Sequence, residues 1–444
     1  MTWIPILSET DSIYEKAWDA VNGIAEAVEK GAYPPLTFSE RQHRGHEGAL
    51  LYGYMALALN SDRWLNCATE HLNSAIDRAH ELKSSPSLYG GLTGLGWVVE
   101  HLARLFQGEC DQPKDGHSSV TQNDNGEESD LNADIDTAVI NALKRRYGQE
   151  SSYDLVSGLV GLGVYFLERL PARSAVHGLK FIFDELENRA RREGRGSTWH
   201  TSPELLPKWQ RDQFPGGYYN LGVAHGIPGI LFFLNELVAV GIEEERALNL
   251  LDSGMMWFLE QKRPPGARSW FSAWLPTPGQ QADSRLAWCY GDLGIAAILK
   301  QIAVRSGRAD WQIFSDEMLE HCLIWPLEES GIRDAPLCHG SAGNAHIFNR
   351  LYQLTGDSRC RQIATSYFED ALNRRRLEGG VAGFFQFTNP DPKVPPIWEP
   401  SPAFLDGASG IALALLGALM PIDPQWDRLL LLSGRSYCRA QPSA

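Results

Sequence analysis

The sequence is poor in positive charge. Its 444 residues carry 40 Lys and Arg against 55 Asp and Glu, a formal net charge of -15. No basic run or basic-aromatic platform compensates for this balance, which excludes binding to nucleic acid by neutralisation of phosphates. The best apolar run, Ile411 to Met420, is far shorter than the roughly 20 residues that cross a bilayer. We therefore expect no nucleic-acid partner and no transmembrane segment.

Cysteine is scarce and scattered. The seven cysteines, at positions 67, 110, 289, 322, 338, 360 and 438, form no compact framework of the kind found in disulfide-rich secreted proteins. Residues 1–9 lack a basic region followed by an apolar one, so no secretory signal is expected. These absences predict a cytoplasmic protein with reduced thiols.

Glycine, in contrast, recurs in an ordered way. With 42 glycines in the chain, chance alone gives about four Gly-x-x-Gly matches, so the bare motif is weak. Seven of the matches, however, are each followed at once by an apolar, helix-like run, and more polar amphipathic segments lie between them. The seven pairs are Gly45 and Gly48, Gly91 and Gly94, Gly158 and Gly161, Gly226 and Gly229, Gly291 and Gly294, Gly340 and Gly343, and Gly407 and Gly410.

This alternation predicts an all-α fold. A helix that is apolar all round is buried, whereas a helix with one apolar stripe lies outside it. We therefore expect an α/α toroid of seven inner and seven outer helices, a single domain over residues 1–444, with a glycine turn at the N-terminus of each inner helix. Glycine there permits positive φ and close approach of backbones. The inner N-termini would share one end of the barrel, where their dipoles favour anions such as thiolates.

Three stretches depart from the helical rhythm. Residues 108–136 are polar, acidic and poor in apolar side chains, which predicts a flexible surface loop. Residues 194–222 and 264–283 are rich in aromatic and turn-forming residues. We expect these two to be inserts that serve as lids or peptide-contact surfaces.

Two glycine turns also carry metal-ligating residues. Cys289 stands two residues before its first glycine, and Cys338 and His339 occupy the two positions before theirs. Successive repeats place equivalent positions close together, so we expect these three side chains to meet. Two sulfurs and one imidazole leave a zinc ion with an open fourth position, as in catalytic sites. The alternative is a pair of buried free cysteines beside an unrelated histidine.

Further candidates stand on or near the same turns. His225 has the register of His339 and is a candidate acid or base, with a structural histidine as the alternative. Asp154, four residues before Gly158, is its expected partner. Arg285 and Tyr290 flank the cysteine ligand and are candidates for stabilising an oxyanion or enolate, with ordinary packing or a salt bridge as the alternative.

The remaining polar residues at the turns receive a structural interpretation. Asp292 and Asp406 are expected to be helix caps. The five cysteines outside the glycine turns, Cys67, Cys110, Cys322, Cys360 and Cys438, are expected to be structural or incidental.

Taken together, these motifs resemble those of the lanthionine synthetase C-like (LanC-type) cyclases. The resemblance rests on Trp288-Cys289-Tyr290-Gly291, Cys338-His339-Gly340 and Ala224-His225-Gly226. It extends over nearly the whole chain through the seven glycine turns. The first repeat, Gly45-His46-Glu47-Gly48, and the acidic loop are the least typical parts.

The resemblance implies a zinc enzyme with one ion per chain, held by the two cysteines and the histidine of the later turns. Members of this family add a peptide cysteine thiol to dehydroalanine or dehydrobutyrine and form lanthionine or methyllanthionine rings. By the same carry-over, His225 would protonate the enolate carbon or manage the thiol proton. Asp154, Arg285 and Tyr290 would assist it.

The resemblance also implies partners. We expect a stand-alone cyclase of lantibiotic biosynthesis that acts on a dehydrated precursor with its leader peptide, beside a separate dehydratase and an exporter. It would be cytoplasmic, either free or peripherally attached to a membrane biosynthetic complex. A LanC-like protein that binds glutathione or transfers it to dehydroamino acids is the first alternative. A zinc scaffold without turnover and an α/α-barrel glycosidase are the others, although a glycosidase gives the cysteines no role.

Overall fold

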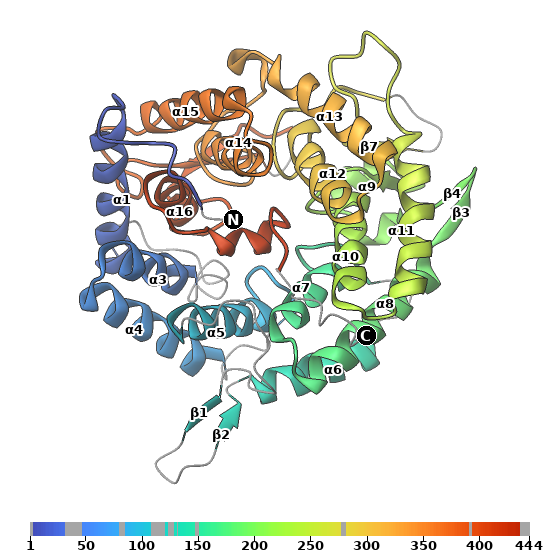
Figure 1. The fold of residues 1–444 in the computed structure, drawn as a ribbon, viewed down its shortest axis with the longest axis horizontal. Helices are drawn as coiled ribbons and strands as arrows, with labels where there is room; N and C mark the ends of the chain where they lie inside the picture. The colour runs from blue at the N-terminus through green and yellow to red at the C-terminus, as the bar shows by residue number, and fades with distance from the viewer. Residues whose placement is uncertain are drawn as a thin grey trace, which may run out of the picture. The chain divides into compact units, whose positions relative to one another are not determined.

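Helices of two kinds alternate along the chain (Figure 1). The computed structural model describes residues 3–31, 47–79, 85–107, 120–122, 128–130, 132–146, 151–276, 281–389 and 393–435. Within these residues, seven helices begin at or beside a glycine turn and are buried along most of their length. These buried helices are α3 (Glu47–Leu59), α5 (Leu92–Gln107), α7 (Leu159–Arg169), α10 (Ile227–Val240), α12 (Asp292–Ser306), α14 (Ser341–Thr355) and α16 (Ala408–Leu419).

The helices between them carry one apolar stripe each and pack it inward. These amphipathic helices are α1 (Tyr14–Glu29), α4 (Asp62–Ala79), α6 (Ala133–Arg146), α8 (Arg173–Arg189), α11 (Glu244–Leu259), α13 (Ala309–Leu323) and α15 (Ser358–Asn373). Short 3-10 helices lie at Pro203–Leu205, Leu327–Glu329 and Gln425–Leu430, and α9 spans Lys208–Gln213. The alternation read from the sequence is therefore present in the described residues.

Close backbone approach explains the glycine turns. A Cβ atom on Gly343 would lie 1.9 Å from the carbonyl oxygen of Leu337, six residues earlier, a distance that no side chain tolerates. The same contact with the carbonyl six residues earlier recurs at Gly161, Gly229, Gly294 and Gly410. Positive φ is used at Gly291, where φ is 143°. The first glycines of four other turns, Gly158, Gly226, Gly340 and Gly407, are extended.

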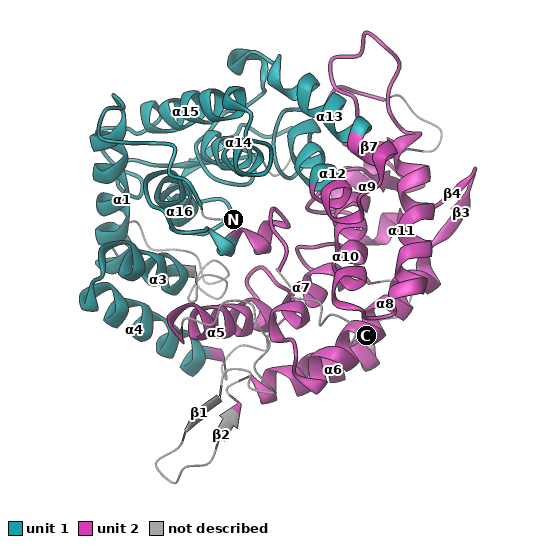
Figure 2. Ribbon diagram, in the orientation of Figure 1, with its two compact units in different colours: residues 1–78, 284–300, 313–426 teal, residues 79–283, 301–312, 427–444 magenta. Residues whose placement is uncertain are grey.

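Two compact units make up the described chain, each built from segments that are distant in the sequence (Figure 2). The first unit comprises residues 1–78, 284–300 and 313–426, and the second comprises residues 79–283, 301–312 and 427–444. In the first unit, α16 packs against α1, α3 and α14, and α14 packs against α15. In the second, α7 packs against α5, α8 and α10, and α10 packs against α11. Successive buried and amphipathic helices are thus partners in both units.

The two aromatic inserts form one small sheet in the second unit. Strand β5 (His200–Thr201) pairs with β6 (Tyr218–Asn220), and β6 pairs with β7 (Trp274–Pro276), both antiparallel. Beside this sheet, Leu206 and Phe214 pack with Tyr218 and Trp274 in an apolar cluster. Strands of two or three residues carry no periodic pattern, so the sequence could not predict this pairing.

Three further strand pairs are short hairpin-like ladders. Strands β3 (Arg191–Glu193) and β4 (Gly196–Thr198) pair in the second unit, and β8 (Gln386–Thr388) and β9 (Ile397–Glu399) pair in the first. The stretch 108–136, expected as a loop, contains the antiparallel strands β1 (Val120–Gln122) and β2 (Glu128–Asp130) and the first residues of α6. The rest of that stretch before Asn132 lies outside the described residues.

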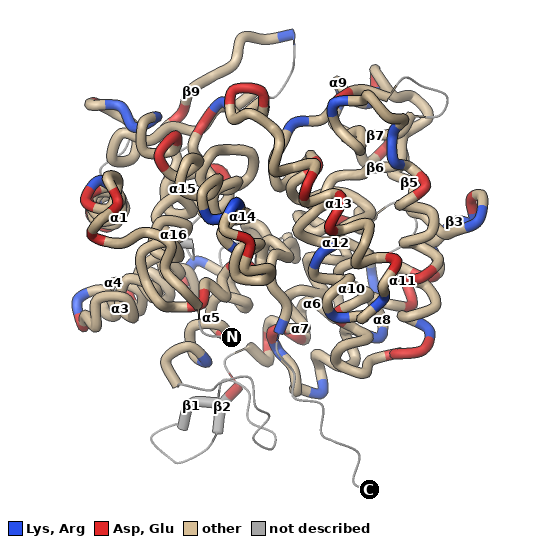
Figure 3. The backbone as a smooth tube through the Cα atoms, turned by 45° about the horizontal axis from the view of Figure 1, so that its top comes forward, with Lys and Arg blue, Asp and Glu red and all other residues tan. Residues whose placement is uncertain are grey.

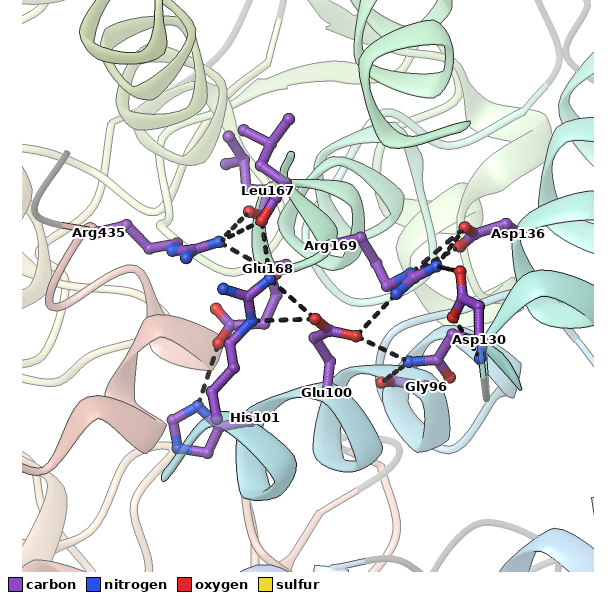
Figure 4. Close-up of polar contacts among 12 residues, drawn as sticks. Gly96, Glu100, His101, Asp130, Asp136, Leu167, Glu168, Arg169 and Arg435 are labelled. Carbon is purple, nitrogen blue, oxygen red and sulfur yellow. Dashed lines mark hydrogen bonds and ion pairs between the residues drawn. The ribbon is translucent and has the colours of Figure 1, made fainter. Parts of the chain in front are cut away.

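Acidic and basic residues are interspersed along the described chain (Figure 3), and a cluster of them is buried in the second unit (Figure 4). Arg169 on α7 pairs with Glu100 on α5 and with Asp136 on α6, each at 2.8 Å. The preceding residue, Glu168, pairs with His101 at 3.3 Å and with Arg428 at 3.4 Å. Buried charges cost free energy unless they are paired, and in this cluster the pairs join α5 and α6 to α7.

Substituting Glu168→Gln is expected to lower the free energy of unfolding at pH 7 by about 3–5 kcal/mol, because it leaves buried cations without their partner. Burial acts to raise the pKa of Glu168, but the Arg428 charge and the hydrogen bond from His101 hold it well below its usual value. A carboxyl with a lowered folded pKa stabilises the protein above its unfolded pKa. The difference between wild type and variant should therefore shrink as pH falls below about 4.3.

Urea unfolding at pH 7 and at pH 4 measures this effect. The matched control is Glu187→Gln, which removes a carboxylate from a pair with Arg246 in which both side chains are largely exposed. Such a surface pair contributes about 0–1 kcal/mol. Equal losses of stability in the two variants would show that the buried pairs of Glu168 contribute no more to the free energy of unfolding than a surface pair does.

Candidate metal centre

Cys289, Cys338 and His339 meet in the first unit. One ligand atom from each of the three side chains lies within 4.8 Å of the others. Cys289 is buried, and Cys338 and His339 are half-buried. Cys289 stands in the turn before α12, and the other two stand in the turn before α14. The structure thus brings together the three residues that the repeat register selected.

Backbone hydrogen bonds hold these turns against each other. The N–H of Cys289 donates to the carbonyl of Cys338 at 3.2 Å, and the N–H of Cys338 donates to the carbonyl of Leu405 at 3.0 Å. The side-chain amide of Asn344 donates to the carbonyl of Leu286 at 2.6 Å. The turns before α12, α14 and α16 are therefore joined in series, which fixes the cysteine backbones independently of their side chains.

Ionisation within the group is concentrated on Cys289. A hydrogen bond from the Cys338 thiol holds the pKa of Cys289 well below its ordinary value despite burial, and His339 lowers it further. The same hydrogen bond, with burial, raises the pKa of Cys338. Burial acts to lower the pKa of His339, but its hydrogen bond to Cys289 and the charge there raise it to about 9. Cys289 is thus the sulfur that ionises first.

Two carboxylates lie beside the group. Asp334 Oδ2 is 3.7 Å from His339 Nε2 and accepts the N–H of Phe387 at 2.9 Å. Burial raises the pKa of Asp334 and that of Asp406, while the charge of His339 acts to lower both. A carboxylate behind a ligating histidine orients the ring and raises its basicity.

Neither carboxylate was assigned to the centre from the sequence. Asp406 was interpreted as a helix cap, but the N-cap of α16 is Gly407, and Asp406 interacts instead with Cys338 and His339. Asp334, five residues before His339, was missed altogether. An acidic residue shortly before a ligating histidine is the signal that could have found it.

The donor set fits zinc. A tetrahedral ion with Zn–S bonds of about 2.3 Å and Zn–N bonds of about 2.0 Å separates its ligand atoms by about 3.5–3.8 Å. The three atoms lie within 4.8 Å, so small side-chain rotations reach that geometry. Two thiolates would offset the charge of the ion. In addition, Asp334 Oδ1 and Asp406 Oδ1 are buried without a hydrogen-bond partner, which suits a site that holds a positive charge.

The described cysteines outside the group have raised pKa values, in contrast to Cys289. Burial raises the pKa of Cys67 to about 11 and that of Cys360 to about 12, and burial also raises the pKa of Cys322. Thiols of this kind stay protonated at neutral pH, and within the described residues none of the three belongs to a group of metal-ligating side chains. Cys110 and Cys438 lie outside the described residues.

His225 and Asp154 form a pair in the second unit. His225 Nδ1 lies 2.7 Å from Asp154 Oδ2, and the side chains are 41% and 10% exposed, respectively. Burial acts to raise the pKa of Asp154, but the hydrogen bond and charge of His225 and the N–H of Ser157 lower it overall. The imidazole therefore has an ionised carboxylate on one nitrogen, and its side chain remains open to solvent.

Local backbone contacts place this pair. The N–H of Leu155 donates to the carbonyl of Ala224 at 3.1 Å, so the residues next to Asp154 and His225 are bonded directly. The N–H and hydroxyl of Ser157 donate to Asp154 Oδ1 at 2.8 Å and 3.3 Å. The carboxylate is thus fixed from three sides, as expected for a group that orients a histidine.

Arg285 and Tyr290 lie on the same turn as Cys289. Arg285 is exposed, and its charge contributes to lowering the pKa of Cys289. Tyr290 is half-buried. Asp292, interpreted as a cap, is the first residue of α12, and its carboxylate lies 3.1 Å from His321 Nε2.

In the part of the chain that the structure describes, no helix is both long and apolar enough to cross a bilayer.

Known proteins share both the sequence pattern and the fold. The sequence model for "Lanthionine synthetase C-like protein" matches residues 48–431. The chain is 24% identical over 297 residues to the nisin biosynthesis protein NisC of Lactococcus lactis subsp. lactis, covering 63% of this chain and 64% of NisC. It is 27% identical over 270 residues to the LanC-like protein GCL1 of Arabidopsis thaliana, covering 55% and 57%.

A third relative is the glutathione S-transferase LANCL1 of Danio rerio, 26% identical over 174 residues, which cover 39% of this chain and 38% of LANCL1. The matched segments therefore span less than two thirds of each of these three relatives. Among solved structures, nisin cyclase superposes with a TM-score of 0.70 at 18% identity, over 94% of this chain and 97% of the cyclase. This likeness confirms the expected α/α-toroid fold class, and the match over residues 48–431 covers most of the sequence. The chain belongs to the lanthionine synthetase C-like protein family.

Proposed function

We propose that the protein is a zinc-dependent cyclase that adds cysteine thiols of a dehydrated peptide to dehydroalanine or dehydrobutyrine. The products are lanthionine and methyllanthionine rings. The observation that carries the proposal is the meeting of Cys289, Cys338 and His339 within 4.8 Å. Their donor set leaves room for a fourth, substrate-derived ligand on a tetrahedral ion, and the fold that supports them is that of nisin cyclase.

The three residues would hold the ion in this proposal, and Asp334 would orient His339 from behind. A bound zinc ion supplies the positive charge that keeps an incoming thiol deprotonated near neutral pH. The hydrogen bonds of Cys338 and His339 lower the pKa of Cys289 despite its burial, and this favours the ionised ligand that metal binding requires.

His225 is the proton donor in this proposal. As the peptide sulfur bonds to the β-carbon, the electrons of the C=C bond move toward the α-carbon and its carbonyl, and the resulting enolate must gain one proton. His225 Nε2 would deliver that proton, while Asp154 on Nδ1 fixes the ring and stabilises the imidazolium. The thiol releases one proton and the α-carbon gains one, so addition is balanced. Arg285 and Tyr290 would stabilise the enolate oxygen.

Partners of the reaction belong to the same proposal. The substrate would be a lantibiotic precursor that carries a leader peptide and has been dehydrated by a separate enzyme, with export of the product by a further protein. The name of NisC as a nisin biosynthesis protein supports a peptide substrate. We place the reaction in the cytoplasm, with the enzyme either free or peripherally attached to a membrane complex.

A second candidate function is transfer of glutathione to dehydroamino acids. It is favoured by the relative named glutathione S-transferase LANCL1, which matches 39% of this chain. The same three ligands and the same histidine would serve this reaction, because only the source of the thiol differs.

Metal analysis and two parallel assays test the proposal. Purified protein should contain about one zinc per chain. With a dehydrated cysteine-containing peptide, cyclisation should leave the peptide mass unchanged but remove thiols that N-ethylmaleimide would otherwise alkylate. With glutathione and a dehydroalanine peptide, the second function predicts a product heavier by one glutathione. A folded protein that binds no added zinc and gives neither product would rule out both functions.

A further inference from the structure

One position of the glycine turns separates the two ligand-bearing repeats from the other four whose turns the structure describes. It is the residue directly after the first glycine, at the start of each buried helix. In the four described turns without metal ligands, this residue is apolar: Leu92, Leu159, Ile227 and Ala408. In the two turns with ligands it is polar, Asp292 and Ser341, and both side chains are 0% exposed.

Asp292 ties α12 to the amphipathic helix that follows it. Its carboxylate lies 3.1 Å from His321 Nε2 on α13, a contact in which this nitrogen donates when it carries the proton. Trp325 packs edge-on against the His321 ring, with ring centroids 5.9 Å apart. The same imidazole nitrogen lies 3.2 Å from Trp325 Nε1, so it contacts both this indole and the first residue of α12, three positions after Cys289.

Ser341 ties α14 to α15 in the same way. Its hydroxyl donates to the carboxylate of Asp370 and accepts from Arg374 Nε at 3.1 Å. Arg374 also pairs with Asp370 at 2.6 Å and donates to the carbonyl of Arg333. The N–H of Ser341 donates to the carbonyl of Asp334 at 3.0 Å. This contact network therefore reaches from α15 to the residue behind His339.

Polar groups at these two buried positions require an explanation, because a buried carboxylate or hydroxyl costs free energy unless it is hydrogen-bonded. The apolar side chains that occupy this position in the other four described turns make contacts that are not directional. Hydrogen bonds are directional, so they fix the rotation of one helix relative to its neighbour. A site that must hold three ligands to within about 0.5 Å needs this precision, whereas a purely structural turn does not.

We infer that Asp292 with His321, and Ser341 with Asp370, are positioning clamps that set the first turns of α12 and α14 and thereby the places of Cys289, Cys338 and His339. The inference rests on the proposed role of those three residues as zinc ligands. The clamp residues do not contact the substrate in this scheme; they act through the ligands.

Zinc affinity, measured by competition with a chromophoric chelator, tests the clamps. Outer contacts of metal ligands change affinity by about 10–100-fold, so Asp292→Ala and Ser341→Ala should each weaken zinc binding by about that factor. The conservative Asp292→Asn keeps an oxygen acceptor for His321 and should stay within about threefold of wild type. The matched control is Ser409→Ala. Ser409 is also 0% exposed and lies in the first turn of α16, and its hydroxyl donates to the carbonyl of Pro402 in the preceding glycine turn at 2.5 Å.

The two serine variants remove the same hydroxyl and should lower the melting temperature by similar amounts. Zinc affinity within twofold of wild type in Ser409→Ala, with a loss of tenfold or more in Ser341→Ala, supports the clamp. Equal affinities in the two variants overturn it. Alkylation rates of Cys289 and Cys338 in metal-free protein give a separate readout. Of the two serine variants, only Ser341→Ala should show faster alkylation than wild type. If wild type binds no zinc, the proposed function fails, and the alkylation rates still decide whether the clamps position the cysteines.

Discussion

Replacement of Cys338 by alanine is expected to remove zinc and cyclisation activity together. Zinc content should fall from about one per chain to below about 0.1, because two protein ligands do not retain the ion that three hold. Activity should fall by at least about 100-fold. The fold should persist, since the hydrogen bond that anchors this turn is made by the backbone N–H of Cys338 to the carbonyl of Leu405 and is kept in the variant. Cys289→Ala should behave in the same way.

A matched control separates loss of a ligand from loss of a thiol. Cys360 lies in the same unit, is also a free cysteine and is fully buried. Burial raises its pKa to about 12, so Cys360→Ala should retain zinc and activity while losing some stability to the small cavity. Elemental analysis measures the zinc content, and circular dichroism checks the fold, of Cys338→Ala, Cys289→Ala and Cys360→Ala. Loss of zinc in the first two variants but not in the third would show that a ligand, and not merely a thiol, has been removed. A full zinc equivalent in folded Cys338→Ala would remove this residue from the ligand set.

Repeat register is why the sequence could predict the meeting of the three ligands. Cys289 and Cys338 are far apart in the chain, but each stands at a fixed offset from a glycine that begins a buried helix, and helices of successive repeats are neighbours. The same reasoning connected His225 with the turn that carries Asp154, and the structure places these side chains in contact. Long, strongly periodic helices gave the fold class for the same reason.

Repeat register did not identify the residues that contact or position the ligands. An Asp immediately before a helix has the signature of a cap whether or not it serves as one, so Asp406 could not be distinguished from a cap without coordinates. Asp334 stands seven residues before the start of α14 and outside the cap positions, so only its place shortly before His339 could have indicated it. The partner of Asp292 is His321 on the next helix, a contact that depends on the rotation of both helices and not on either sequence alone.

The pairing of the two aromatic inserts could not be predicted from the sequence, for a different reason. Strand β6 lies before α10 and α11 in the chain, and β7 lies after them. Their ladder is three residues long, too short for alternation of apolar and polar residues to be visible. Composition identified both inserts as departures from the helical pattern, but only the structure shows that they form one sheet.

Substitution of His225 by alanine is expected to reduce the rate of addition by about 10²–10⁴-fold while zinc is retained, because a positioned acid or base contributes a factor of that size. The side chain is open to solvent, so the fold should tolerate the change. Asp154→Asn should keep the hydrogen-bonded shape but lose the charge that stabilises the imidazolium, and its rate should lie between those of wild type and His225→Ala. His177→Ala, which removes an exposed histidine from α8 in the same unit, is the matched control and should keep the wild-type rate.

Product stereochemistry gives the sharper test of the same residue. A fixed donor delivers its proton to one face of the enolate, so wild type should form a single configuration at the α-carbon. In His225→Ala, water must supply that proton, and the slow residual product should be a mixture of both configurations. Chiral amino-acid analysis of hydrolysed rings, with zinc measured on the same samples, reports both effects. A slow variant with full zinc and a single configuration would mean that another group protonates the enolate and that His225 serves only to accept the thiol proton. Wild-type rate and configuration together would remove His225 from the mechanism.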